Sequence, residues 1–211
     1  SNMSGSSLYS LKQQSLSMAK DLSAATKTVT DAVTIYANEN ESVSSMLNKA
    51  QPTVLLSAAS GMSSSSSADA IQGILNQFNL SEDQAMHVAD TVEKLSSEIA
   101  LDFSKGCDTI SQSIATSGSV VNEAGMSFEK YAALVSTTAE KTRVSGSQIG
   151  NAFKTIFSRI SRSKDGLTTD AEMSDAEAAL KSVGVSVRRA DGDLRDISDT
   201  LDDLNKVCIM Q

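Results

Sequence analysis

Apolar residues recur at alternating intervals of three and four along the first 50 residues of the chain. Polar residues interrupt the repeat at Ser15 and Glu39. Its members are Leu8, Leu11, Met18, Leu22, Ala25, Val29, Ala32, Tyr36, Val43, Met46 and Ala50. Such a heptad seam is typical of a coiled coil or a long bundle helix. We therefore predict one long amphipathic helix over residues 3–51, which Pro52 should end because it restricts the residue before it.

Residues 52–69 have a different composition, with a run of five serines from Ser63 to Ser67. Serine side chains offer no apolar surface to bury, and such runs are typical of flexible linkers. We therefore predict a Ser-rich linker over residues 52–69 that separates the N-terminal helix from the rest of the chain.

Several short amphipathic patterns follow, separated by breaks. Ser81, Ser127 and Ser145 each precede an apolar stripe and stand where a helix N-cap is expected. Gly106 and Gly118 should weaken the helix expected after residue 102, each by roughly 1 kcal/mol relative to Ala. We predict a compact multi-helix module over residues 70–205.

The end of this module carries a different signal. Val185 and Val187 alternate with polar residues, and Asp191-Gly192 is a dipeptide typical of hairpin turns. We predict a small β-hairpin at about residues 185–195 and a tail at 206–211. The predicted fold class is all-α: an N-terminal long helix or coiled-coil segment, then the multi-helix module with its one small β-hairpin.

The clearest helix pair lies between residues 122 and 160, where two apolar stripes must be buried against a partner. The predicted interaction faces are Phe128, Tyr131, Val135, Ile149, Phe153, Ile156, Phe157 and Ile160. A basic patch follows on the second helix and beyond it, formed by Lys154, Arg159, Arg162 and Lys164. Acids dominate residues 165–203, so the patch either pairs with them or contacts another protein or the DNA backbone.

Composition and charge favour a helical protein and argue against some classes of function. Hydrophobic residues make up 40% of the 211 residues, aromatic residues only 4%, and there is no Trp and one Pro, which favours helices. The formal net charge of −8 argues against binding duplex DNA by general electrostatics. We expect no membrane span and no signal peptide.

Ser1-Asn2 before Met3 is typical of a tag remnant, so native sequence is expected to start at Met3.

No arrangement of residues predicts catalysis or a bound metal. His87 is the only histidine and has no nucleophile partner in the pattern, so we interpret it as a solvated helix residue. Cys107 and Cys208 lack the spacing of a zinc site and fit small apolar residues in a reducing compartment. A calcium site is disfavoured because a glycine stands second instead of sixth among Asp191, Asp193, Asp196 and Asp199. We predict a protein that is not an enzyme and holds no cofactor or metal.

The order of residues also resembles a known family. The resemblance rests on residues 125–129, 132–134, the pairs Ser145-Gly146 and Ile149-Gly150, and the run 154–160. It continues over residues 180–188, Gly192, 194–195, Ile197 and 201–204. From about Leu80 to Leu204 the chain is similar to the core of phage tail tape measure proteins.

This resemblance implies a structural protein of a phage or prophage tail. Such a protein templates tail tube length and assembly, lies in the tube lumen of the virion after synthesis in the bacterial cytoplasm, and leaves when DNA is ejected. Its implied partners are tail tube and tail assembly proteins, with no sequence-specific nucleic acid. The heptad seam further predicts that copies of the chain associate with one another through Leu8–Ala50. The alternative is a bacterial helical coiled-coil interaction or signalling module without catalysis.

The acidic balance leads to a first prediction. Titration of labelled duplex DNA with the protein at physiological salt should give no change in fluorescence anisotropy, because the net charge repels phosphate. Saturable binding under these conditions would contradict the prediction.

Overall fold

The computed structural model describes residues 4–37, 42–99, 102–161, 175–193, 195–196, 199–203 and 206. Its helices are α1 (Gly5–Asp21), α2 (Thr26–Ala37), α3 (Val43–Ser60), α4 (Ser64–Phe78), the 3-10 turn η1 (Glu82–Gln84), α5 (Ala85–Glu98), α6 (Phe103–Glu123), α7 (Phe128–Thr142), α8 (Gly146–Ser161) and α9 (Asp175–Ser182). The predicted all-α class is confirmed. None of the described helices is long and apolar enough to cross a membrane.

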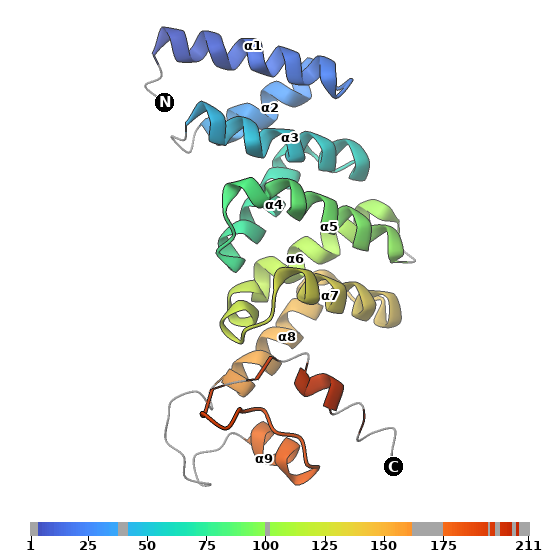
Figure 1. The fold of residues 1–211 in the computed structure, drawn as a ribbon. Helices are drawn as coiled ribbons and strands as arrows, with labels where there is room; N and C mark the ends of the chain where they lie inside the picture. The colour runs from blue at the N-terminus through green and yellow to red at the C-terminus, as the bar shows by residue number, and fades with distance from the viewer. Residues whose placement is uncertain are drawn as a thin grey trace.

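The helices form two layers along an elongated stack. From α1 to α6, each helix packs against the next helix in the chain and against the one after it, so α2, α4, α6 and α8 form one layer and α1, α3, α5 and α7 the other. Figure 1 shows the helices lying across the long axis, with α1 at one end and α9 at the other. This is the arrangement of an α-solenoid, in which each unit contacts only its neighbours.

Two apolar clusters fill the space between the layers. The N-terminal cluster includes Leu11, Val29, Tyr36, Met46 and Val54, and reaches Ala68 in α4. The larger cluster begins at Leu56 in α3 and extends through α4, α5, α6 and α7 to Phe157 in α8. Both clusters therefore share helices α3 and α4, and the stack is continuous across them.

Local capping explains where several helices begin. The side chains of Asp102 and Ser127 accept hydrogen bonds from backbone N–H groups in the first turns of α6 and α7. Ser145 and Gln148 form a reciprocal capping box at the start of α8. At the end of α6, Gly125 takes a φ of +90°, which residues other than glycine rarely adopt. The N-caps predicted at Ser127 and Ser145 are confirmed.

The single long helix predicted over residues 3–51 is wrong. The segment forms α1, α2 and the first half of α3, with a turn after α1 in which Ser23 has a φ of +49°. Heptad residues meet each other inside the chain, because the helices fold back and bury Leu11, Val29 and Tyr36 in one cluster. Pro52 lies inside α3 and does not end it.

The predicted Ser-rich linker at 52–69 is also wrong. Most of it belongs to α3 and α4, and Ser63 is the N-cap of α4, accepting a hydrogen bond from the Ser66 N–H group. Serine is a favoured N-cap because its hydroxyl binds an N–H group that the helix leaves free. Ser67 is fully buried next to Ala68, so small side chains serve close packing here.

The predicted β-hairpin at 185–195 does not form strands among the described residues. One isolated bridge lies at Arg188, and two backbone hydrogen bonds cross the loop, from Arg189 N–H to Asp193 C=O and from Arg195 N–H to Val187 C=O. The Ser186 hydroxyl both accepts from the Arg188 N–H and donates to the Arg188 C=O. The Ser186 side chain thus occupies backbone N–H and C=O groups that a longer β-ladder would need for its own hydrogen bonds. Of the predicted tail at 206–211, only Lys206 lies within the described residues.

Candidate functional site

The two helices singled out in the sequence are α7 and α8, and α8 lies along α6 at very short distance. A Cβ atom added at Gly146 would lie 2.4 Å from the Thr109 carbonyl oxygen. One added at Gly150 would lie 2.8 Å from the Thr116 Cβ and 2.9 Å from the Ser113 carbonyl oxygen. The Ser113 hydroxyl donates to the Gly146 carbonyl at 2.8 Å. The two glycines therefore let the helix backbones touch, and we call this contact the α6–α8 seam.

Aromatic side chains fill the wedge where α7 meets the α6–α8 seam. Tyr131 is fully buried, and its hydroxyl shares a hydrogen bond of 2.5 Å with the Ser117 hydroxyl of α6. Its ring contacts Phe153 and Phe157 edge-on, with centroids 5.6 and 6.3 Å away. Burial raises the pKa of Tyr131 to about 12, although the Ser117 hydrogen bond acts in the opposite direction. The phenol therefore stays neutral and serves packing, not proton transfer.

The predicted interaction faces are used mainly inside the chain itself. Five of these side chains are buried in the larger cluster, namely Phe128, Tyr131, Val135, Ile149 and Phe157. Phe153 is half-buried against the same cluster, whereas Ile156 is 46% exposed. The side chain of Ile160 lies outside the described residues. The partner that these apolar stripes required is thus the chain's own helices.

The predicted basic patch is described at only one position. Lys154 is exposed on α8, while the side chains of Arg159, Arg162 and Lys164 lie outside the described residues. That these four residues form a patch therefore stays a prediction. An ion pair with the acidic C-terminal segment does occur, but from α7: Lys130 Nζ lies 2.9 Å from an Asp196 carboxylate oxygen. The hydrogen bond with Asp196 raises the pKa of Lys130.

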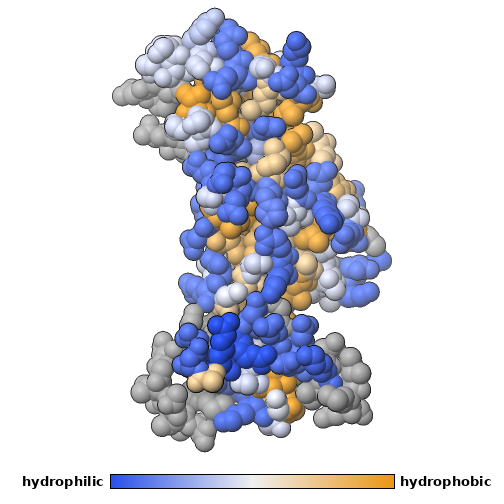
Figure 2. All heavy atoms as spheres, in the orientation of Figure 1, coloured by the Kyte–Doolittle hydropathy of each residue, from blue (hydrophilic) through white to orange (hydrophobic). Residues whose placement is uncertain are grey.

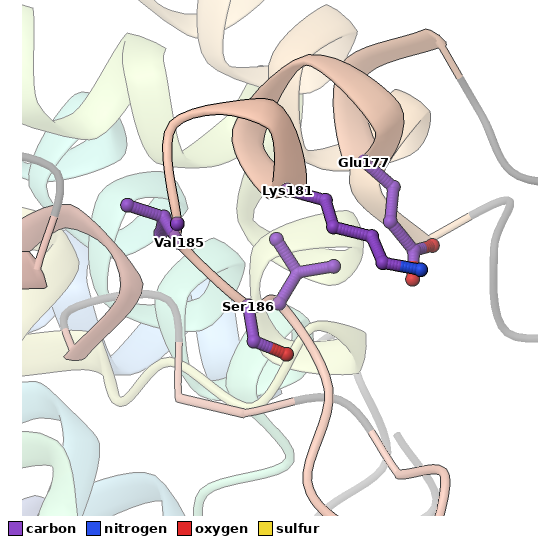
Figure 3. Close-up of a pocket in the computed structure, with 6 residues that line it drawn as sticks. Glu177, Lys181, Val185 and Ser186 are labelled. Carbon is purple, nitrogen blue, oxygen red and sulfur yellow. The ribbon is translucent and has the colours of Figure 1, made fainter.

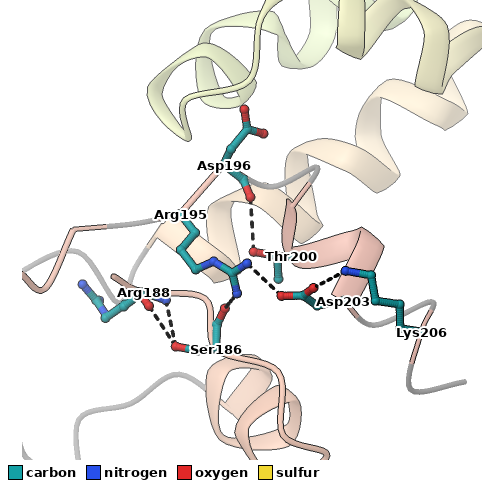
Figure 4. A network of polar contacts seen from close by, with 7 residues as sticks. All are labelled: Ser186, Arg188, Arg195, Asp196, Thr200, Asp203 and Lys206. Atoms are coloured by element: carbon teal, nitrogen blue, oxygen red, sulfur yellow. Dashed lines mark hydrogen bonds and ion pairs between the residues drawn. The ribbon is translucent and has the colours of Figure 1, made fainter. Parts of the chain in front are cut away.

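Figure 4 shows a polar network that holds the C-terminal loop. Arg195 donates to the Ser186 carbonyl at 2.8 Å and to an Asp203 carboxylate oxygen at 2.7 Å. Lys206 donates to the other Asp203 oxygen at 2.9 Å, and these bonds from Lys206 and Arg195 lower the pKa of Asp203. Arg188 pairs with Glu177 of α9 at 3.1 Å. The network is structural, because its charged groups bind one another.

A small hollow lies between α9 and this loop (Figure 3). It is lined by Glu177, Lys181, Gly184, Val185, Ser186 and Val187. The Ser186 hydroxyl is bonded to the Arg188 backbone, so it is not held by a base as a nucleophile would be. Among the described residues, no three His, Cys, Asp or Glu side chains are grouped as a metal site would require. Asp196 of the disfavoured calcium set is engaged with Lys130.

His87 is an exposed residue of α5, as interpreted from the sequence, and it also joins α5 to α7. Its Nε2 lies 2.8 Å from a Glu129 carboxylate oxygen, and about half of each side chain is exposed. Partial burial raises the pKa of Glu129, but hydrogen bonds from His87, from the Glu129 backbone and from Ser127 outweigh it, so the pKa is lowered. Cys107 is fully buried, as predicted for a small apolar residue, and burial raises the pKa of its thiol.

Sequence reasoning missed the residues of α6 that face α8. Thr109, Ser113 and Ser117 stand four residues apart, the same interval as Gly146 and Gly150 on α8. Small residues at this interval form one stripe on a helix and allow close approach of a second helix. Matching the two stripes would have indicated this pairing.

A second prediction concerns the α6–α8 seam. Gly146→Ala should lower the free energy of unfolding by about 1–3 kcal/mol, because the added methyl group overlaps backbone that cannot yield. Gly73→Ala is the matched control: nothing lies within 4 Å of a Cβ atom there, and Ala is the better helix former. Urea unfolding followed by circular dichroism measures both. Equal stability of Gly146→Ala and the unchanged protein would contradict the tight contact.

A third prediction concerns the His87–Glu129 pair. The pKa of Glu129 is lower in the folded protein than in the unfolded chain, so the ionised carboxylate stabilises the fold. This stability is fully present at pH values above the unfolded-state pKa and is lost as the pH falls through the folded-state pKa. Glu129→Gln should therefore reduce stability at pH 7 by well under 1 kcal/mol, since the pair is half exposed.

The same urea midpoints, measured near pH 3, should show a smaller difference between Glu129→Gln and the unchanged protein. A difference that grows as the pH falls would have the wrong sign for this pair.

Comparison with known proteins shows which family this chain is similar to. The model of a family described as phage-related minor tail protein matches residues 12–208. The chain is 24% identical over 190 residues to a protein described as a probable tape measure protein of Escherichia phage P2. That alignment covers 90% of this chain but only 22% of the phage protein, so the chain spans about a fifth of its relative. No solved structure matches the chain significantly.

Proposed function

Because this chain belongs to the family of phage-related minor tail proteins, we propose that it is part of a tape measure protein that templates tail tube length and assembly. The proposal includes release of the chain when DNA is ejected, residence in the tube lumen of the virion, and tail tube and assembly proteins as partners. It also includes the absence of catalysis. The observation that carries it is the family match over residues 12–208, together with the likeness to a probable tape measure protein.

The role of the matched residues supports a structural function. Gly146, Gly150, Phe128 and Phe157 belong to the residues that carried the family resemblance, and all four hold helices together. The polar groups of the C-terminal loop are likewise engaged in binding one another. These residues build a scaffold, which is what a tail structural protein requires of them.

The two-layer stack also suits a chain that changes length. Each helix packs mainly on its nearest neighbours, so helices can leave the stack one after another without dissolving a single central core. Drawn out as a continuous helix, the 190 matched residues would span roughly 285 Å at 1.5 Å per residue. In the stack the helices run back and forth, so the folded form is far shorter. We infer that the folded form precedes loading into the tube, where the chain is extended.

The proposal also includes self-association, through a smaller part of the predicted Leu8–Ala50 segment. Most of the heptad residues are buried within the chain, including Leu11, Val29 and Tyr36. Among the described residues of this segment, the exposed large apolar side chains lie on α1, where Leu8, Tyr9 and Leu16 are exposed by 60, 67 and 43%. Apolar surface is visible at this end of the stack in Figure 2. Association between copies would therefore use α1 and not a long coiled coil.

A fourth prediction tests the templating role in the phage that carries this gene. In-frame deletion of residues 5–60 should shorten the tails by about 80 Å, and duplication of the same segment should lengthen them by the same amount, if the segment is extended in the tube. Tail lengths are measured on negatively stained particles.

The duplication keeps the experiment decisive if the deletion prevents assembly. A phage with Leu8→Ser, which changes no chain length, is the control and should keep normal tails. Normal tails of unchanged length in both the deletion and the duplication would refute the templating role of this segment.

A further inference from the structure

Helix α3 crosses the boundary between the two apolar clusters. Met46, Leu47, Ala50 and Val54 lie in the N-terminal cluster, whereas Leu56 lies in the larger one. With α4, this helix is thus one of the two continuous elements that connect the two clusters. Any weakness in its middle falls where the clusters meet.

Pro52 places such a weakness in the middle of α3. It is buried, ten residues into a helix that runs from Val43 to Ser60. Proline has no backbone N–H group, so the helical hydrogen bond to the Asn48 carbonyl is missing, and its ring crowds that carbonyl. Among all residues, proline is the least favourable in a helix interior.

The same turn of α3 carries a buried cation. Lys49 has no exposed surface; its ammonium group donates to the Gln72 side-chain carbonyl at 2.8 Å and lies 4.6 Å from the Tyr36 ring centroid. The Thr53 hydroxyl donates to the Lys49 carbonyl at 2.8 Å and shares a 2.7 Å hydrogen bond with the Tyr36 hydroxyl. Polar groups from α2, α3 and α4 therefore form a buried layer beside the Pro52 turn.

These groups behave differently from an apolar core when water enters. Burying a charged or polar group is unfavourable unless its hydrogen bonds are replaced, and opening restores its hydration. When the chain opens at this layer, water can therefore hydrate the Lys49 ammonium group and the Thr53 hydroxyl. The Asn48 carbonyl, which the Pro52 ring crowds, also becomes free to bind water. Opening at this layer also uncovers Val54 and Ala68, whereas opening within the larger cluster would expose larger apolar side chains such as Ile71 and Ile110.

We propose that the Pro52 turn of α3 is a built-in break point, at which residues 5–51 separate as one unit while α4–α8 stay folded. In the tail this would make the N-terminal helices the first to be extended. That use rests on the proposed function, whereas the break point itself is a property of the fold.

The test is hydrogen exchange of the full chain, followed by mass spectrometry of peptides. Amides of α1, α2 and the first half of α3 should exchange together and at least about tenfold faster than amides of α6 and α8. Pro52→Ala restores the missing N–H group, so exchange of residues 5–51 should slow by about tenfold. This is the fifth prediction.

Gly73→Ala is the matched control, because it also introduces Ala into a helix interior and nothing lies within 4 Å of a Cβ atom there. It should leave exchange of residues 5–51 unchanged. The proposal is overturned if residues 5–51 are as protected as α6 in the unchanged protein, a comparison that needs no variant. It is also overturned if both substitutions slow the N-terminal helices equally, or if Pro52→Ala does not slow them. Unchanged tail lengths in the phage would refute the templating role and leave the break point standing.

Discussion

The architecture depends on how closely α8 approaches α6. At Gly146 and Gly150 the backbone of one helix lies directly on the other, and the Ser113 hydroxyl closes the contact with a hydrogen bond to a helix carbonyl. The depth of this contact sets where Phe157 meets Tyr131 and thereby where α7 lies. A methyl group at either glycine would push apart helices that the rest of the larger cluster is built around.

Small side chains also occupy part of the interior, beside the larger apolar ones. Ser67, Ser113 and Ser117 are fully buried, and the aromatic content of the chain is only 4%. Such interiors bring helices close together, but each contact buries less apolar area than Leu or Phe would, and apolar area is the main source of stability. A stack of this kind is held by many modest contacts between neighbours. This property is consistent with a chain that folds on its own and is later drawn out.

Charge is arranged to hold the C-terminal part in place. Lys130 binds Asp196 from α7, and Arg195 with Lys206 encloses the Asp203 carboxylate. These pairs are partly exposed, so each contributes little and is weakened by salt. The apolar contribution comes from Val185 and Val187, which are buried outside the two main clusters. The C-terminal segment is thus a small unit of its own at the end of the stack.

Features that depend on neighbours in the chain could be read from the sequence by itself. These include the all-α class, the N-caps at Ser127 and Ser145, and the helix end at Gly125, since capping and left-handed backbone are decided within a few residues. The family resemblance was equally a property of residue order. The apolar stripes of α7 and α8 were located correctly, but not what they pack against.

Only the tertiary structure decided how the helices pair. A heptad pattern is the same for a helix that binds another chain and for one that folds onto its own, so one long helix and three short ones could not be distinguished. The carbonyls next to Gly146, and the burial that keeps α3 helical through Pro52, come from residues distant in the chain. Local propensity is worth about 1 kcal/mol at a glycine and about 3 at a proline, and packing across many residues outweighs it.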